Sequence, residues 1–185
     1  MAAKQTETAM PLPEFDAPVK VLIVVAPFYR DIADDLIRGA KAALDAAGAE
    51  WEVVEVPGAL EVPPAIALAH EHANFDAYVA LGCVIRGETT HYETVCNDSS
   101  RGLTLLGLGG ACIGNGILTV ENRDQALVRA DPERQDKGGG AAAAALHLLA
   151  LARKWRRAGR DVGFKPPAGS FRIADDGTTE GPGRA

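Results

Sequence analysis

Apolar positions recur along the chain in two patterns, and each pattern predicts one kind of element. Residues 20–26, KVLIVVA, form a short, β-branched and almost continuously apolar run, which is typical of a strand buried on both faces of a sheet. From Asp31 onward the apolar residues recur at helical spacing, with charged residues on the opposite face. Asp31 is a candidate N-cap for this helix, and Gly48 stands where a glycine would end it.

The same alternation of strand and helix patterns continues to residue 155. Further strands are predicted over residues 51–56, 77–83 and 111–119. Further helices are predicted from Pro63 to about residue 71 and over residues 90–106, 122–130 and 140–155, with glycines 138–140 as a lead-in to the last one. Strands separated by helices form right-handed βαβ units. The sequence therefore predicts an α/β fold with three layers, a flavodoxin-like four-stranded parallel sheet flanked by helices on both faces.

The two ends of the chain lack this periodicity. Residues 1–18 contain three prolines, and the residues from Gly159 onward are rich in Gly, Pro, Asp and Thr. The chain has 185 residues, which suits one domain with loose ends. We expect a disordered arm over residues 1–18, one domain over 19–157 and a flexible tail over 158–185.

Charge and cysteine content limit the partners and the location of the protein. The formal net charge is −6, which argues against nucleic acid as a partner. No apolar run approaches the roughly 18 residues of a membrane span, and the N-terminus lacks the apolar core of a secretory signal. The three cysteines, Cys83, Cys96 and Cys112, have no paired spacing and are interpreted as free thiols in a reducing compartment. The expected location is the cytoplasm.

The loop after the third predicted strand carries the strongest chemical signal. It runs from the strand through Gly87 into a helix start, a geometry that directs free N–H groups and the helix dipole at an anion. Thr90 and Glu93 match the Thr-x-x-Glu capping box. His91, in the first helical turn, could move a proton beside that anion. The alternative is that Thr90 only caps the helix and that His91 is a solvated or core residue.

The loops after the other strands add weaker signals. Phe28 and Tyr29 follow the first strand, where an aromatic face could stack on a flat heterocycle or merely cover the core. Gly58 permits close backbone approach after the second strand, and Glu61 lies near the next helix start. After the fourth strand, Asn122 can cap a short helix that carries Arg129, which is either a phosphate ligand or a solvated charge.

Several kinds of catalytic or cofactor site have no support in the sequence. His70 and His72 are two residues apart and face different sides of a helix, so they form a poor metal pair. There is no Cys-x-x-Cys motif, no phosphate-binding Walker loop and no dinucleotide fingerprint after a strand. His147 lies on an Ala- and Leu-rich helix and is interpreted as a packed or interface residue. Metal, nucleoside triphosphate and dinucleotide chemistry are therefore unsupported, and we predict no metal.

Four segments together resemble one protein family, the lumazine synthases. They are residues 26–29 (APFY), 56–63 (VPGALEVP), 80–92 (ALGCVIRGETTHY) and 115–122 (NGILTVEN), and Gln125-Ala126, Arg129-Ala130 and Lys137-Gly138 complete the set. The resemblance covers roughly residues 18–157, and its segment 82–91 is highly specific. It implies a reaction that condenses 5-amino-6-ribitylaminopyrimidinedione with 3,4-dihydroxy-2-butanone 4-phosphate to dimethyl-ribityllumazine, the precursor of riboflavin, without a cofactor.

The resemblance also implies a role for each matching residue. His91 would shuttle protons during imine formation and elimination. The pyrimidinedione and its ribityl chain would be bound by Phe28, Gly58, Ala59, Leu60, Glu61, Val84, Ile85, Asn115 and Lys137. The phosphate would be bound by Gly87, Glu88, Thr89, Thr90 and Arg129. Asn115 departs from the family, because many relatives have an aromatic residue there.

Shared active sites are a further implication of the resemblance. Asn115 and Arg129 would reach the site from a neighbouring subunit, so the chain is expected to form pentamers, decamers or hollow shells of sixty subunits. Three other readings compete with that of an active synthase. They are a flavin- or lumazine-binding relative without activity, a container protein whose shell matters more than turnover, and an unrelated sugar-phosphate enzyme on a similar sheet.

Overall fold

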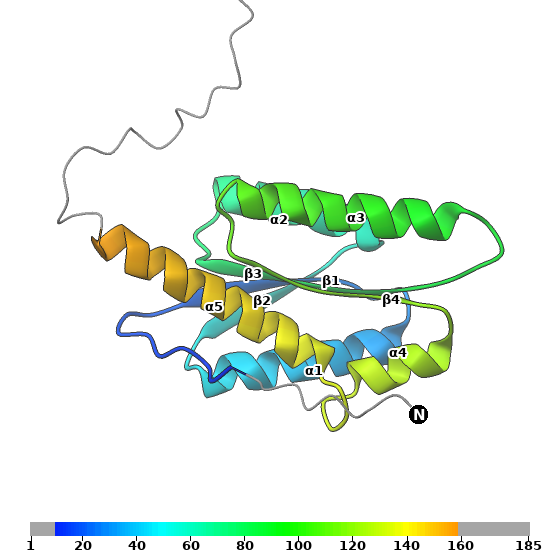
Figure 1. Cartoon of the computed structure of the whole chain (residues 1–185), viewed down its shortest axis with the longest axis horizontal. Coiled ribbons are helices and arrows are strands. Elements are labelled where there is room, and N and C mark those ends of the chain that lie inside the picture. Colours follow the sequence, from blue (N-terminus) through cyan, green and yellow to red (C-terminus); the bar gives the residue numbers. More distant parts are fainter. Residues whose placement is uncertain (1–9, 159–185) are drawn as a thin grey trace, which may run out of the picture.

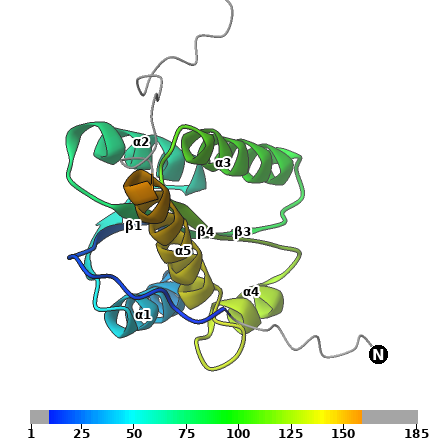
Figure 2. The same cartoon turned by 60° about the vertical axis from the view of Figure 1, so that its left-hand side comes forward.

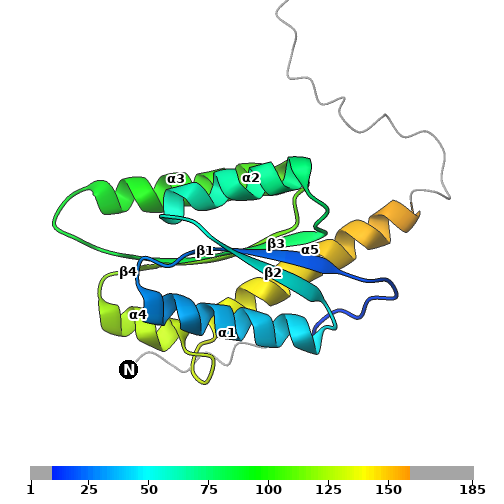
Figure 3. The ribbon, with the colours of Figure 1, turned by 180° about the vertical axis from the view of Figure 1, so that it is seen from behind.

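The structure is a computed structural model, and it describes residues 10–158. Its elements are β1 (Lys20–Ala26), α1 (Arg30–Ala46), β2 (Glu50–Glu55), the 3-10 turn η1 (Ala59–Glu61), α2 (Val62–His72), β3 (Ala77–Ile85), α3 (His91–Leu108), β4 (Ile113–Val120), α4 (Arg123–Ala130) and α5 (Lys137–Ala158). The strands pair in parallel in the order β2-β1-β3-β4. Helices α2 and α3 cover one face of the sheet, and α1, α4 and α5 cover the other (Figures 1 and 3). The predicted three-layer α/β fold is confirmed.

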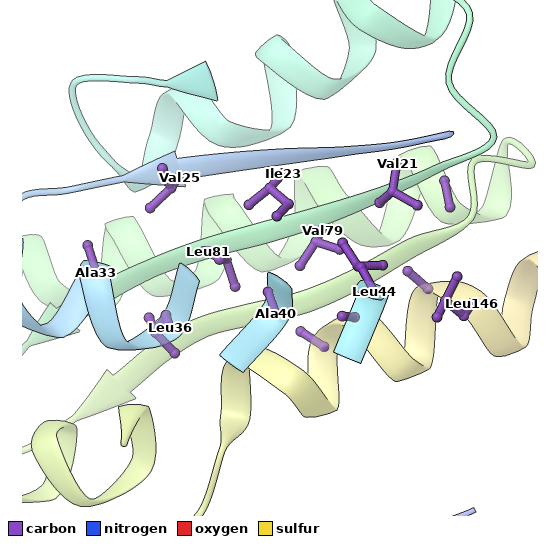
Figure 4. Close-up of a cluster of buried hydrophobic side chains, with 14 of the residues drawn as sticks. Val21, Ile23, Val25, Ala33, Leu36, Ala40, Leu44, Val79, Leu81 and Leu146 are labelled. Atoms are coloured by element: carbon purple, nitrogen blue, oxygen red, sulfur yellow. The ribbon is translucent and has the colours of Figure 1, made fainter. Parts of the chain in front are cut away.

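Two apolar cores, one on each face, explain the nearly continuous apolar run of β1. Successive strand side chains point to opposite faces. Val21, Ile23 and Val25 therefore belong to the core that includes α1 and α5, and Leu22 and Val24 belong to the core under α2 and α3. Figure 4 shows the first three facing the apolar side of α1. Because both faces are covered, no position in the run needs to be polar.

Helix α5 begins at Lys137, three residues earlier than predicted, so the glycines at 138–140 are helical residues. The helix lies beside α1 and runs obliquely to the strands (Figure 2). A Cβ atom at Gly138 would lie 2.1 Å from the carbonyl oxygen of Leu36, and one at Gly114 would lie 1.8 Å from that of Ala141. These glycines allow α5 to approach α1 and β4 at backbone distance, which compensates for the poor helix propensity of Gly138.

The end of α1 follows the prediction, and its beginning does not. Gly48 has a positive φ of 66°, and the N–H groups of Gly48 and Ala49 donate to the carbonyls of Asp45 and Leu44 at 3.0 Å. This is a Schellman ending, whose positive φ favours glycine. The prediction that Asp31 caps the start is wrong, since α1 begins at Arg30 and Asp31 pairs with Arg123 instead.

Part of the predicted N-terminal arm packs against the domain. The side chains of Leu12 and Phe15 contact the core beside α1 and α5. Arg153 donates to the carbonyls of Ala17 and Pro18 at 3.2 and 2.9 Å, and Arg157 donates to both carboxylate oxygens of Asp16 at 2.7 Å. The prediction of a disordered arm is therefore wrong for residues 10–18. Residues 1–9 and the predicted tail from 159 onward lie outside the described residues.

Candidate active site

A cavity of about 420 Å³ lies where β1, β2 and β3 reach their carboxyl ends. We call it the strand-end pocket. It is lined by Ala26, Phe28, Tyr29, Pro57, Gly58, Ala59, Leu60, Glu61, Cys83, Val84, Ile85, His91 and Val95. Eight of these residues were predicted to bind substrate or to act as catalyst. The carboxyl ends of parallel strands are the usual ligand site of such sheets, and the volume suits a small molecule.

The walls of the strand-end pocket are mainly apolar. The ring of Phe28 is 73% exposed and contacts Tyr29 edge to face, with the ring centroids 5.0 Å apart. An aromatic face left in solvent beside a cavity suits stacking on a flat heterocycle. Burial raises the pKa of the Cys83 thiol to about 11, so this thiol is neutral at physiological pH. The pocket thus offers a mainly apolar surface with a few polar groups, among them the Glu61 carboxylate.

The residues at the start of α3 are arranged differently from the predicted capping box. The Thr90 side chain makes no capping hydrogen bond, and its backbone is helical, with φ −69° and ψ 0°. Glu93 does not reach back to the helix start because its carboxylate accepts a hydrogen bond from Arg86. The capping-box prediction is therefore wrong. Since no side-chain cap covers this helix start, its N–H groups and the dipole remain available to an anion.

His91 connects this helix start to the strand-end pocket. It is the first residue of α3, it is exposed, and its side chain lines the pocket together with Val95, one turn later on the same helix face. The adjoining residues Gly87, Glu88, Thr89 and Thr90 form the exposed connection from β3 to α3. The structure thus brings the predicted proton carrier and the predicted phosphate turn to the same end of the sheet.

A second cavity, of about 500 Å³, collects the remaining predicted residues. We call it the edge-strand pocket, because it lies between β4, at one end of the strand order, and α5. It is lined by Asn115, Gly116, Ile117, Leu118, Thr119, Arg129, Lys137, Gly140, Ala141 and Ala144. The Asn115 side-chain oxygen accepts from the N–H of Ile117 at 3.0 Å, and the Arg129 guanidinium donates to the carbonyl of Gln125 at 3.0 Å. The two pockets share no lining residue, so one chain holds the predicted site in two separate parts.

Several residues in or near the pockets were not among the predicted site residues. Cys83 and Val95 line the strand-end pocket, and helical spacing from His91 could have indicated Val95. Arg86, between β3 and the phosphate turn, forms ion pairs that local sequence patterns do not reveal. Asn122 caps α4 as predicted, because its side chain accepts from the N–H of Gln125 at 3.0 Å.

Three further features of residues 10–158 concern metals, disulfides and membranes. Within that range no group of three or more His, Cys, Asp or Glu side chains is placed to hold a metal ion. The three cysteines, all in that range, are free thiols, as predicted. None of the helices in the same range is long and apolar enough to cross a membrane.

The fold and the strand-end pocket define an α/β protein of the class that binds small molecules at the carboxyl ends of a parallel sheet. Comparison with known proteins identifies the family within this class. The family described as 6,7-dimethyl-8-ribityllumazine synthase matches residues 18–153, and the chain belongs to this family.

Individual relatives agree with this assignment. A 6,7-dimethyl-8-ribityllumazine synthase of Jannaschia sp. (strain CCS1) is 56% identical over 173 residues, which are 94% of this chain and 97% of the relative. One of Novosphingobium aromaticivorans is 61% identical over 136 residues, which are 74% of this chain and 98% of the relative. A 6,7-dimethyl-8-ribityllumazine synthase 1 of Rhizobium meliloti is 54% identical over 140 residues, 72% of this chain and 92% of the relative. The predicted enzyme class, a transferase that forms 6,7-dimethyl-8-ribityllumazine, is confirmed.

Proposed function

We propose that the pyrimidinedione substrate binds in the strand-end pocket and that the condensation takes place there. The observation that carries this proposal is the convergence of Phe28, residues 58–61, residues 84–85 and His91 on one cavity. Phe28 would stack on the heterocycle, because its ring is exposed at the cavity. Residues 58–61 (Gly58, Ala59, Leu60, Glu61) and Val84 with Ile85 would orient the ring and its ribityl chain through their backbone and polar groups.

The phosphate of the second substrate is assigned to the turn at Gly87, Glu88, Thr89 and Thr90. This turn is exposed and leads into a helix start without a side-chain cap, so N–H groups and the positive end of the dipole are available to a dianion. Arg129 supplies a guanidinium for the same phosphate. Its present partner is a neutral carbonyl oxygen, which a phosphate would replace with a charge-assisted interaction.

The reaction balances without an oxidant, a reductant or a cofactor. The 5-amino group attacks the ketone, and loss of water gives an imine. Elimination of phosphate then gives an enol that tautomerises to a carbonyl, and attack by the ribitylamino nitrogen with loss of a second water closes the ring. His91 would carry protons between these groups, while the pocket holds the two substrates in register.

We further propose that the active site forms between neighbouring copies of the chain. Asn115, Arg129 and Lys137 lie in the edge-strand pocket, which shares no residue with the strand-end pocket. A neighbour that presents its edge-strand pocket to the strand-end pocket would complete the site with both a polar wall and an arginine. Exposed Leu105 and Leu108, 59% and 82% exposed on α3, supply apolar surface for such an assembly.

The assembly favoured here is a homopentamer, with decamers and sixty-subunit shells as larger forms built from it. A head-to-tail interface that closes into a ring places one complete site at each contact. The cytoplasm is the proposed location, in keeping with the free thiols of the cysteines.

An absorbance assay with both substrates tests this function. The purified protein should form the lumazine chromophore much faster than the spontaneous condensation, and sedimentation velocity should give a pentamer or a multiple of one. A folded oligomer that binds riboflavin tightly and forms no product would instead be a flavin-binding relative.

A further inference from the structure

Arg86 lies between the third strand and the proposed phosphate turn, and it is absent from both pocket linings. Its backbone N–H donates to the carbonyl of Val120 at 3.0 Å and so extends the pairing of β3 with β4 by one residue. The backbone of Arg86 is therefore fixed by the sheet, whereas the turn that follows it is exposed.

The Arg86 side chain contacts three groups on two other segments. Its Nε donates to a carboxylate oxygen of Glu121 at 2.7 Å, and one of its terminal nitrogens donates to Glu93. Its guanidinium carbon lies 4.1 Å from the ring centroid of Tyr92. Glu121 directly follows β4, and Tyr92 and Glu93 belong to the first turn of α3. One guanidinium thus ties the start of α3 to the ends of β3 and β4.

These contacts close a loop around the proposed phosphate turn. Arg86 precedes residues 87–90, and its partners Tyr92 and Glu93 follow both this turn and His91. The hydrogen bond from Arg86 lowers the pKa of Glu93, so that carboxylate remains charged at physiological pH. The fork geometry of arginine allows it to hold two carboxylates and stack on a ring at once, which lysine does not match.

We propose that Arg86 is a positioning residue for the reaction, which sets the geometry of the phosphate turn and of His91 without contacting the substrate. This inference rests on the proposed placement of the phosphate at residues 87–90. Exposed ion pairs add little to folding stability, so its contribution is expected mainly in the alignment of the site. Because two carboxylates on separate segments already hold the guanidinium, it positions their segments instead of binding the phosphate.

The test measures KM for each substrate and kcat in the intact oligomer for variants of all three charged partners. Arg86→Met, Glu93→Ala and Glu121→Ala should each raise KM for the butanone phosphate about tenfold and lower kcat several-fold, with KM for the pyrimidinedione changed less than about threefold. Glu93→Gln and Glu121→Gln retain an acceptor oxygen and should stay within about threefold of the parent. Arg157→Met, which removes an exposed ion pair with Asp16 far from the turn, is the matched control and should leave both KM values unchanged.

The direction of the change in KM for the butanone phosphate distinguishes a positioning role of Arg86 from direct binding of the phosphate. If Arg86 binds the phosphate itself, Arg86→Met raises KM while Glu93→Ala and Glu121→Ala lower it by releasing the guanidinium, which would overturn the inference. Equal changes in both KM values, accompanied by a lower Tm, would overturn it in favour of a general structural role.

Arg129→Met, measured in parallel, separates this inference from the proposed function. If Arg129→Met raises KM for the phosphate substrate and the Arg86, Glu93 and Glu121 variants do not, only the inference on Arg86 fails. If none of these variants changes that KM, the placement of the phosphate fails, and the inference fails with it.

Discussion

The two pockets of one chain differ in both position and chemistry. The strand-end pocket lies over the carboxyl ends of three strands and presents an exposed aromatic ring, a neutral thiol and a histidine. The edge-strand pocket lies between the outermost strand and α5 and presents an amide, an arginine and a lysine. The first suits an uncharged heterocycle and the second an anion or a polar chain. Under the proposed function, a reaction that joins one substrate of each kind uses both pockets, which is why we propose that two chains form each site.

The backbone beneath the two pockets also differs in how tightly it is packed, and this gives the largest expected effect. Gly114→Ala places a Cβ atom 1.8 Å from the carbonyl oxygen of Ala141 in α5. We expect a loss of about 3 kcal/mol in the free energy of unfolding, because the helix must move away from the strand. Gly82→Ala is the control, since its Cβ meets nothing closer than 3.5 Å. Urea unfolding at equal protein concentration measures both, and equal losses would contradict the difference in packing.

The next largest effect concerns the histidine of the strand-end pocket. His91→Ala should lower kcat about a hundredfold, within the usual contribution of a proton carrier, and leave both KM values within about threefold. Turnover should remain measurable because substrate alignment persists. His72→Ala, which alters an exposed histidine at the end of α2, is the control. Unchanged kcat in His91→Ala would remove this residue from the mechanism.

The arginine of the edge-strand pocket should affect one substrate selectively. Arg129→Met should raise KM for the butanone phosphate about thirtyfold, the magnitude of one charge-assisted hydrogen bond, with little change for the pyrimidinedione. Arg129→Lys keeps the charge but loses the forked guanidinium, so its KM for the butanone phosphate should lie between those of the wild type and Arg129→Met. Initial rates over a grid of both substrate concentrations give the two KM values. A selective effect on KM for the pyrimidinedione would mean that Arg129 does not bind the phosphate.

The aromatic residue of the strand-end pocket should show the reverse selectivity, with a smaller magnitude. Phe28→Ala should raise KM for the pyrimidinedione about tenfold, the upper range for an aromatic contact, and leave KM for the phosphate substrate nearly unchanged. Phe28→Tyr preserves the ring and serves as the matched control. Equal changes for both substrates would mean that the ring supports the pocket as a whole.

The last prediction concerns the thiol of the strand-end pocket, since alkylation of Cys83 should be very slow at neutral pH. Its pKa is raised to about 11 by burial, so only a minute thiolate fraction exists at pH 7. Because the thiolate is the reactive form, the rate of alkylation should increase about tenfold for each pH unit and level off only near pH 11. Mass spectrometry after iodoacetamide treatment over pH 7–10 measures it. Bound pyrimidinedione should slow the reaction, and a plateau near pH 8 would contradict an apolar environment for this thiol.

The sequence predicts most of the sheet because burial on both faces leaves a clear signal in β1 and β3. It misplaces the start of α5, since Gly138 has a poor helix propensity that close packing on Leu36 overrides. The capping-box prediction fails for a similar reason. Thr90 and Glu93 have the right spacing, but Arg86 competes for the Glu93 carboxylate through a contact that no local pattern contains.

The same difference between local and tertiary information decides which parts of the site could be predicted from the sequence. Residues after β1, β2 and β3 could be assigned to one end of the sheet, because parallel strands all end there. The separation of Asn115 and Arg129 into a second pocket depends on where α5 lies against β4, which periodicity does not determine. From the sequence, the placement of these two residues on a neighbouring chain is predicted by the family resemblance alone, and the separation of the two pockets supports that proposal.

Subunit complementation tests the shared active site most directly. Chains carrying His91→Ala and chains carrying Arg129→Met should each be impaired, and each retains the pocket that is altered in the other. When the two variants co-assemble in equal amounts, about a quarter of all sites should have two intact pockets, because each proposed site takes one pocket from each of two adjacent chains. Activity near a quarter of the wild-type value at low butanone phosphate would agree with that account. Activity no greater than the average of the two separate variants would contradict it.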